Sequence, residues 1–360
     1  MERYGRMARV FKNNQCTLGM CTPIFKKSDF LLCKVPVPEG YPQSQTHVGI
    51  GLLSSGQYVM TTSPYPSVRY RFPISFIRAA IRKLSNNRFF YHSGEFYENP
   101  CIYVNEIKNE IPPTLFKLAQ PGPLMGPLPS LYGYPSFNSD PDLFIENDKV
   151  YVLNRSIYRQ KGKYNFYMKL YLIEGTIEND CFIPNSMSLF REGKDIVGSQ
   201  CLTNYKGNYI LTDIISNSYN DGQTYRGIRY ITANSLENLR LSTQWNSVKL
   251  KTEDYLPWHM SLFQHNDTLY TIIACVKKGV PQRCWQLLGK FSDDLSSLSI
   301  YKKPLTDYNS YRGAAIVLDN GDFVFYNTTV RESVKGGKSV DGREIMMARM
   351  PFAVLLDQIK

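Results

Sequence analysis

The chain has 360 residues, a formal net charge of +11 and a high aromatic content that includes 26 Tyr. This length allows two average domains or one large all-β domain, and the composition excludes a disordered chain. No apolar run reaches the roughly 18–20 residues that cross a bilayer, and no signal-peptide pattern follows the basic N-terminus. We therefore expect a protein without a transmembrane segment that is cytoplasmic, or part of a virion if a phage encodes it.

The cysteines and the positive charge leave some functions open and disfavour others. Eight cysteines are scattered without a C-x-x-C pair, which favours buried free thiols over zinc ligands. We expect no metal and no cofactor. Basic residues crowd between Arg69 and Arg88, where they suit phosphate, an acidic glycan or an acidic protein. No nucleic-acid-binding motif accompanies them, so nucleic acid is not expected as a partner.

The first third of the chain combines a terminal segment, a hairpin and an insertion. Residues 1–45 are predicted to pack on or close a domain that spans residues 46–360. A helix is predicted over residues 73–87, because apolar residues recur there at helical spacing. Its other face carries Arg78, Arg82 and Lys83, which either solvate the helix or dock an acidic protein. Residues 111–135 are rich in proline and glycine and predict a long surface loop.

Five hairpin-like segments recur along the chain, each with an apolar strand, a Gly/Asn/Asp turn and a second apolar strand. They cover residues 48–62, 138–156, 199–214, 260–275 and 313–327, with turn residues Gly56, Asp148, Gly207, Asp267 and Gly321. The last four turn residues are 59, 60 and 54 positions apart, which leaves room for four short strands per unit. Residues 232–250 and 291–305 are predicted to close two of the units as outer hairpins.

This repeat predicts an all-β fold, a five-bladed β-propeller with the helix and the Pro/Gly-rich loop inserted in the first blade region. A β-sandwich is the alternative, although it does not explain the matched hairpins. In a propeller the first strand of each blade lines the channel. The polar residues at the five blade starts, near residues 47, 140, 199, 259 and 312, are therefore expected to converge at the channel mouth.

Carboxylate, imidazole, guanidinium and aromatic groups at these starts suit a carbohydrate. The candidate substrate-binding residues are His47, Tyr65, Asp142, Arg155, Gln200, Trp258, His259, Tyr311 and Arg312. Each also has a structural interpretation: the aspartates cap turns, Arg312 neutralises a buried carboxylate, and His259 is a packed core histidine.

Several short motifs give the chain a family resemblance. They read THVG (46–49), SPYP (63–66), ENPCI (98–102), SDPDL (139–143) and WHMS (258–261). In this order the chain resembles the five-bladed propeller glycoside hydrolases, a group that includes arabinanases, β-xylosidases, invertases and mannoside phosphorylases. The resemblance covers roughly residues 45–330. It implies a glycan-binding site at the channel mouth, with Asp140 and Glu98 as the candidate catalytic pair.

The chain departs from this pattern at the acids. Gly49 and Ser261 stand where the pattern would place acidic residues, and Gln200 stands where the third blade would supply a general acid. Glycosidases need two carboxyl groups that face each other across the bond. Asp140 and Asp142 are expected to point to opposite faces of one strand. Whether the chain is an enzyme is therefore open.

Three functions remain after the sequence analysis. The first is a glycoside hydrolase, or a phosphorylase in which Arg312, His259 and His47 bind phosphate. The second is a non-catalytic glycan-binding propeller, such as a divergent, inactive member of the family in a phage tail. The third is a scaffold that uses the basic helix and the Pro/Gly-rich loop to dock a partner.

Overall fold

The computed structural model describes residues 22–41, 43–65, 67–70, 98–126, 136–159, 166–193, 199–216, 226–252, 255–277, 280–335 and 338–359, together with positions 73, 76, 77 and 80. The predicted helix over residues 73–87 lies largely outside the described residues, and so do Arg78, Arg82 and Lys83. Within the described part of the predicted loop, Phe116–Leu118 forms a short strand. Among the described residues, no helix has the length and apolarity that a membrane crossing requires.

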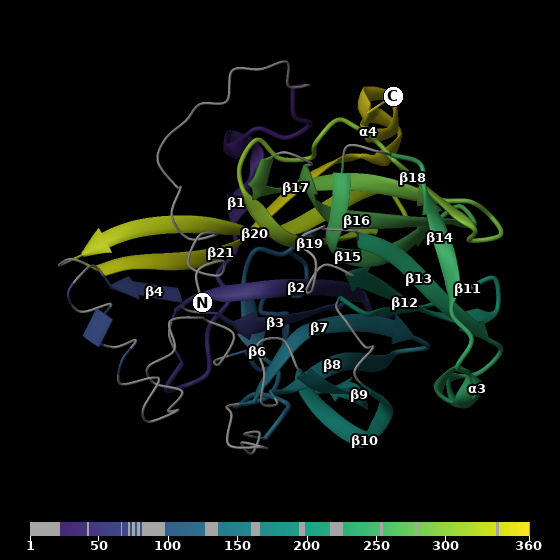
Figure 1. Ribbon diagram of the computed structural model, residues 1–360, viewed down its shortest axis with the longest axis horizontal. Coiled ribbons are helices and arrows are strands. Elements are labelled where there is room, and N and C mark those ends of the chain that lie inside the picture. Colours follow the sequence, from purple (N-terminus) through teal and green to yellow (C-terminus); the bar gives the residue numbers. More distant parts are fainter. Residues whose placement is uncertain are drawn as a thin grey trace.

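Antiparallel strands dominate the described chain, which confirms the prediction of a mostly β protein (Figure 1). The first unit consists of β2 (Gln45–Leu52), β3 (Tyr58–Pro64), β5 (Cys101–Asn105) and β6 (Phe116–Leu118). The second unit consists of β7 (Phe137–Glu146), β8 (Lys149–Arg159), β9 (Phe166–Glu178) and β10 (Cys181–Gly193). Each unit pairs its strands in chain order.

The third and fourth units follow the same plan. The third consists of β11 (Cys201–Tyr205), β12 (Asn208–Ser216), β13 (Arg226–Ala233) and β14 (Asn246–Leu250), with helix α3 (Leu236–Leu241) before its last strand. The fourth consists of β15 (Tyr255–His265), β16 (Thr268–Lys277), β17 (Val280–Phe291) and β18 (Ser297–Ile300). The outer strands β14 and β18 pair in parallel, so these two units share one eight-stranded sheet.

The fifth unit joins the two ends of the described chain. It consists of β19 (Ser310–Val317), β20 (Asp322–Lys335), β21 (Lys338–Pro351) and β1 (Leu31–Leu32). A 3-10 turn, η1 (Lys27–Asp29), precedes β1, and helix α4 (Phe352–Ile359) follows β21. The far end of β21 pairs with β4 (Ser67–Tyr70) where the long yellow hairpin extends from the rest of the molecule (Figure 1).

The five predicted hairpins are confirmed as the first two strands of the five units. Each predicted turn residue has a positive φ, between 55° and 84°. Asparagine, aspartate and glycine tolerate this left-handed conformation better than other residues, so the turn sequences determine where each hairpin reverses.

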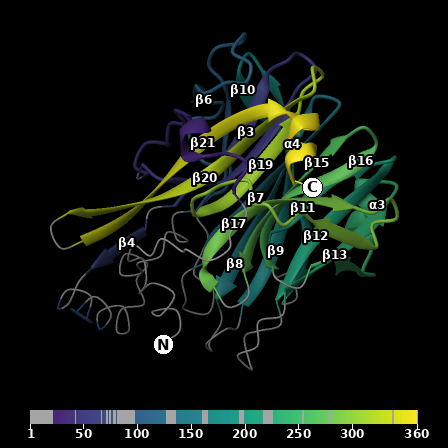
Figure 2. The same cartoon turned by 90° about the horizontal axis from the view of Figure 1, so that it is seen from above.

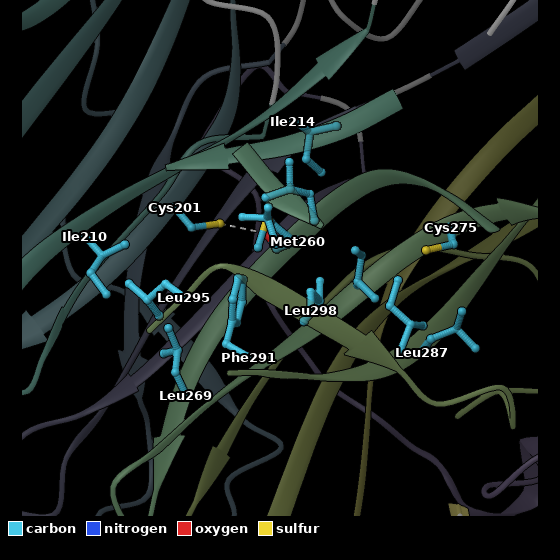
Figure 3. Packing of buried hydrophobic residues seen from close by; sticks show 14 of the residues in the cluster. Cys201, Ile210, Ile214, Met260, Leu269, Cys275, Leu287, Phe291, Leu295 and Leu298 are labelled. Atoms are coloured by element: carbon cyan, nitrogen blue, oxygen red, sulfur yellow. Dashed lines mark hydrogen bonds between the residues drawn. The ribbon is translucent and has the colours of Figure 1, made fainter. Parts of the chain in front are cut away.

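The hydrophobic core is divided into five clusters, each between two consecutive units. Along β8, for example, Val150 and Val152 pack toward the first unit, whereas Tyr151 and Leu153 pack toward the third. Figure 3 shows the cluster between the third and fourth units, where the Cys201 thiol donates to the Met260 carbonyl over 2.9 Å. Because strand side chains alternate between faces, a sheet buried on both faces needs apolar residues on both.

The clusters and the first strands both close into a ring. The fifth unit packs on the fourth and also on the first. Each of the first strands β2, β7, β11, β15 and β19 contacts the first strands of the two neighbouring units. The labels of β7, β11, β15 and β19 lie near the middle of the molecule in the second view (Figure 2). A sandwich with one core between two sheets does not have this cyclic order.

Candidate functional site

Four of the five first strands are interrupted by a bulge at the predicted start. The strand register shifts between Thr46 and Gly49, Ser139 and Asp142, Pro257 and His259, and Ser310 and Gly313. His47, Asp140 and Ser199 have φ values of 56°, 51° and 48°, a left-handed conformation that is rare for such residues. Bulges redirect side chains next to functional sites. Here they bring together His47, Asp140 and His259, which we call the His–Asp–His cluster.

Asp140 is the centre of this cluster. Its Oδ1 lies 3.2 Å from Nε2 of His47 and 3.6 Å from Nδ1 of His259. Its Oδ2 accepts a hydrogen bond from Arg155, which also donates to Ser139 over 3.4 Å. All three residues of the cluster are at most 4% exposed. One carboxylate oxygen therefore faces two imidazoles, and the other is held by a guanidinium.

Glu98 lies on the other side of His47. Its Oε2 is 3.1 Å from Nδ1 of His47, and its side chain is buried. The structure thus brings together the two predicted catalytic carboxyl groups, Asp140 and Glu98, but the imidazole of His47 lies between them. A glycosidic bond cannot be clamped directly between the two carboxyl groups while the ring remains there.

Aromatic rings border the His–Asp–His cluster, and we call Tyr65, Trp258 and Tyr311 the aromatic edge. The ring centroid of Tyr311 is 4.6 Å from that of His259 and 5.3 Å from that of His47. The Trp258 indole N–H donates to the Tyr311 hydroxyl over 3.5 Å. Trp258 and Tyr311 are only partly buried, so this edge offers ring surface to a ligand.

Arg343 joins the aromatic edge without any signal in the sequence analysis. Its guanidinium carbon lies 3.8 Å from the ring centroid of Tyr65 and 4.3 Å from that of Tyr311. It also donates to the Thr46 hydroxyl over 3.0 Å. One guanidinium therefore contacts both rings, whose centroids are 6.2 Å apart, in a cation–π arrangement. Arg343 lies on the last strand of the chain, where no local pattern marks it.

The other predicted residues have structural partners. Arg312 donates to Asp142 over 2.8 Å and to the Pro141 carbonyl over 2.9 Å, and it is fully buried. Asp142 also accepts from the Leu202 amide over 3.0 Å. Arg312 thus pairs with a buried carboxylate, as its structural interpretation requires. Its guanidinium is engaged by protein groups, which leaves the predicted phosphate site without support from this residue.

Gln200 likewise points to an internal partner. Its side-chain amide donates to Asp213 over 3.3 Å. Asp213 is buried and paired with Arg229 over 2.7 Å. The third unit therefore supplies an amide and a carboxylate that is paired with Arg229.

Burial and neighbouring charges separate the pKa values of the two candidate acids. Burial opposes the ionisation of Asp140, but neighbouring positive charge, above all that of Arg155, outweighs it and holds the pKa of Asp140 well below its usual range. Burial, with the negative charge of Asp140, raises the pKa of Glu98 well above its usual range. Burial also lowers the pKa of His47 to about 3. The site thus holds Asp140 ionised and His47 neutral at neutral pH.

The His–Asp–His cluster also has the composition of a metal site. Its ligand atoms all lie within 4.8 Å of one another, and two imidazoles with one carboxylate are a common donor set. The sequence analysis expected no metal, because its spacing criterion considers only ligands that are close together in the sequence.

Comparisons with known proteins reveal a shared fold at low sequence identity. No model of a known protein family matches the chain. No curated protein matches it by sequence. Among solved structures, an N-acetylgalactosamine deacetylase from F. plautii, in complex with blood group B trisaccharide, matches with a TM-score of 0.55 and 12% identity. The match covers 94% of this chain and 98% of that one.

Two further solved structures come from other carbohydrate-active proteins. A xylan β-1,4-xylosidase from Bacillus halodurans C-125 has a TM-score of 0.55 and 12% identity, with 87% of this chain and 54% of that chain covered. A mannose phosphorylase from Leishmania mexicana, in complex with phosphate ion, has a TM-score of 0.50 and 11% identity, with 90% and 88% covered. At these identities the likeness shows the fold alone, so the chain shares its fold with these carbohydrate-active proteins, in line with the resemblance to propeller glycoside hydrolases.

Proposed function

We propose that the five units are the blades of a β-propeller and that the protein binds a carbohydrate at the His–Asp–His cluster and hydrolyses it. The ring of first strands and the five core clusters between consecutive units support the propeller. The solved structures that share the fold include a deacetylase, a xylosidase and a phosphorylase, all of which act on sugars by their names.

One observation carries this proposal: bulges on separate first strands bring a carboxylate, two imidazoles and aromatic rings together. His47, Asp140 and His259 are far apart in the sequence, and none of them fills an apolar core. Sugars offer hydroxyl groups to charged and imidazole groups, and apolar C–H faces to rings such as those of Trp258 and Tyr311. Ligand sites commonly combine such apolar walls with a few polar groups.

In the proposed site Asp140 is the catalytic carboxylate and the aromatic edge is the sugar platform. Glu98 acts through His47, because the imidazole lies between Glu98 and Asp140. Glu98 is therefore a positioning residue in this arrangement, rather than the direct partner that the sequence analysis predicted.

A second candidate function is glycan binding without turnover. It is favoured by the position of His47 between the carboxyl groups and by the engagement of Asp142 with Arg312. Glycoside hydrolysis requires two carboxyl groups separated by about 5–10 Å with the sugar between them. In this alternative the same aromatic edge binds the sugar, and Asp140 only orients it.

The test is an oligosaccharide panel with binding and product formation measured separately. We expect the wild-type protein to bind at least one sugar and to release a product detectable by mass spectrometry. Trp258→Ala should weaken binding by at least about 10-fold, the effect of a lost contact of about 1.4 kcal/mol. Asp140→Asn should retain binding and lose at least about 100-fold in rate, as expected for a catalytic acid or base.

Two matched controls keep this test specific. Trp245 contacts Arg191 of the second unit and Arg229 of the third, so Trp245→Ala should leave sugar binding unchanged. Asp213 is buried and paired with an arginine as Asp140 is, so Asp213→Asn controls for the loss of a buried ion pair. Binding without any product would favour the second function. The absence of binding across the panel, or equal losses in the controls, would contradict both functions.

A further inference from the structure

We propose that His47, Asp140 and His259 bind a divalent transition-metal ion, for which Zn²⁺ is the probe. Such an ion deepens the proposed function, because it would supply electrophilic assistance at a site with one directly placed carboxylate. The reaction class rests on the proposed function, whereas the metal site rests only on these three side chains and their surroundings.

The distances between the facing atoms fit a metal ion. Two ligands that are each about 2.1 Å from a tetrahedral zinc ion lie roughly 3.4 Å apart. Oδ1 of Asp140 is 3.2 Å from Nε2 of His47 and 3.6 Å from Nδ1 of His259, values on either side of that separation. All three ligand atoms lie within 4.8 Å of one another. A slight movement of the two imidazole rings toward each other would bring all three ligand atoms to the separations of a tetrahedral zinc site.

The imidazole nitrogens make no other hydrogen bond in the described structure. The four nitrogens of His47 and His259 are buried, and none makes a hydrogen bond of good geometry to a described residue, although Nδ1 of His47 lies 3.1 Å from Oε2 of Glu98. Buried polar atoms are nearly always satisfied, so the two nitrogens that face Asp140, Nε2 of His47 and Nδ1 of His259, require an explanation. A metal ion among them would satisfy one nitrogen of each ring.

The groups behind the cluster are arranged as the outer shell of a metal site. Glu98 lies 3.1 Å from Nδ1 of His47, which leaves Nε2 toward Asp140. A carboxylate behind a metal-binding histidine is a recurrent arrangement that fixes the orientation of the ring. Arg155 occupies Oδ2 of Asp140 and leaves Oδ1 facing the two histidines. Three protein ligands leave a coordination position open for an oxygen atom of water or of a sugar.

Metal binding can be measured on the whole 360-residue chain without any carbohydrate. The protein is treated with EDTA, dialysed, and titrated with Zn²⁺ by calorimetry, with bound metal counted by mass spectrometry. We expect about one equivalent for a single three-ligand site. His259→Gln should weaken Zn²⁺ binding by at least about 100-fold, and Glu98→Gln by about 10–100-fold.

His265→Gln is the matched control, because His265 is a partly exposed histidine that packs against Phe352 outside the cluster. It should retain the wild-type affinity. Near-UV circular dichroism verifies that each variant is folded. A second readout is the melting temperature: Zn²⁺ should raise it in the wild-type protein and in His265→Gln but not in His259→Gln, since an ion that binds only the native state stabilises it.

Two results would overturn the proposal. One is a folded wild-type protein that takes up no Zn²⁺ and shows no shift in melting temperature. The other is a His259→Gln variant that binds Zn²⁺ as tightly as the wild-type protein. Because these titrations contain no sugar, failure of the metal site leaves the carbohydrate proposal intact, and failure of sugar binding leaves the metal site intact.

Discussion

Asp142 and Arg312 form a buried ion pair that links different units of the molecule. Arg312 lies on β19, and its partners Asp142 and Pro141 lie on β7. Asp142 also accepts from the Leu202 amide on β11. Burial raises the pKa of Asp142 to about 6, and Arg312 and the backbone amides oppose this rise. Removal of one partner therefore leaves a buried group without compensation.

We expect Arg312→Met to lower the free energy of unfolding by about 3–5 kcal/mol, the range for breaking a buried pair. Urea denaturation measures this change. The double variant Asp142→Asn/Arg312→Met should lose less than Arg312→Met alone. Arg240→Met, which breaks the exposed pair with Glu237, is the control and should change stability by at most about 0.5 kcal/mol. Equal losses in Arg312→Met and Arg240→Met would contradict the assigned role.

Gly49 explains one departure from the glycosidase pattern by close packing. A Cβ atom added at Gly49 would lie 2.8 Å from Cγ2 of Thr61 and 2.9 Å from Cβ of Leu143. The strands β2 and β7 approach so closely here that no acidic side chain can be accommodated. The sequence shows that the acid is absent at this position, and the close packing of β2 against β7 explains why.

Gly49→Ala should lower the free energy of unfolding by about 1–3 kcal/mol, because it overpacks a buried contact. Gly122→Ala is the control, since no atom lies within 4 Å of its added Cβ. The control should stay within about 0.5 kcal/mol of wild type. Chemical denaturation measures the free energy of unfolding of both variants. A Gly49→Ala variant as stable as the wild-type protein would show that β2 and β7 can move apart.

At the scale of elements, the turns were the most predictable feature. The turn between β15 and β16 has φ values of 46° at Asn266 and 55° at Asp267. A side chain branched at Cβ does not tolerate this conformation, whereas glycine adopts it freely. The preference for positive φ depends on these two residues alone, so the sequence is enough to locate the turn.

We predict that Asp267→Gly preserves or raises stability, whereas Asp267→Val lowers the free energy of unfolding by at least about 1 kcal/mol. Thermal melts of the two variants provide the comparison. The Tyr205 hydroxyl donates to the backbone carbonyl of residue 267, so both substitutions retain that bond. A Val variant as stable as the Gly variant would show that the positive φ is not maintained.

The prediction of an outer hairpin over residues 232–250 was wrong. Helix α3 forms there between β13 and β14. The Ser235 side chain accepts from the Asn238 amide over 3.1 Å and caps this helix. The cap signal was present in the sequence, but a six-residue helix leaves little apolar periodicity for a pattern to detect.

For the whole molecule, the N-terminal segment completes the fifth unit. Strand β1 pairs with β21, and the preceding Phe25 bridges to Thr306. Phe30 is buried with its ring centroid 5.3 Å from that of Tyr308 and 6.2 Å from that of Phe325. The described part of this segment, from residue 22 on, thus packs on the fifth unit, and the role of residues 1–45 in closing the domain stays a prediction.

Phe30→Ala should therefore lower the free energy of unfolding by about 3–5 kcal/mol, the cost of removing a buried aromatic ring. The neighbouring Leu31 is 57% exposed, so Leu31→Ala is a matched control with an expected change of at most about 0.5 kcal/mol. Chemical denaturation of both variants measures the free energy of unfolding and so tests whether the N-terminal segment stabilises the fifth unit. A loss in Phe30→Ala no larger than that in the control would contradict it.

The site was predictable in its members and less so in its geometry. The polar strand starts identified His47, Asp140 and His259, because the repeat indicated which residues occupy equivalent positions. The repeat could not show that His47 lies between Glu98 and Asp140, since this depends on bulges and on contacts between units. Arg343 was missed for the same reason, because Tyr65 follows β3 of the first unit and Tyr311 lies on another strand of the fifth unit, so neither contact leaves a local pattern.

The most direct test of the central claim is a crystal structure of the Asp140→Asn variant with the oligosaccharide that the panel selects. We predict that a sugar ring stacks on Trp258 or Tyr311, with a hydroxyl or acyl oxygen within hydrogen-bond distance of His259. Well-defined sugar bound elsewhere on the molecule, with an empty His–Asp–His cluster, would contradict the account.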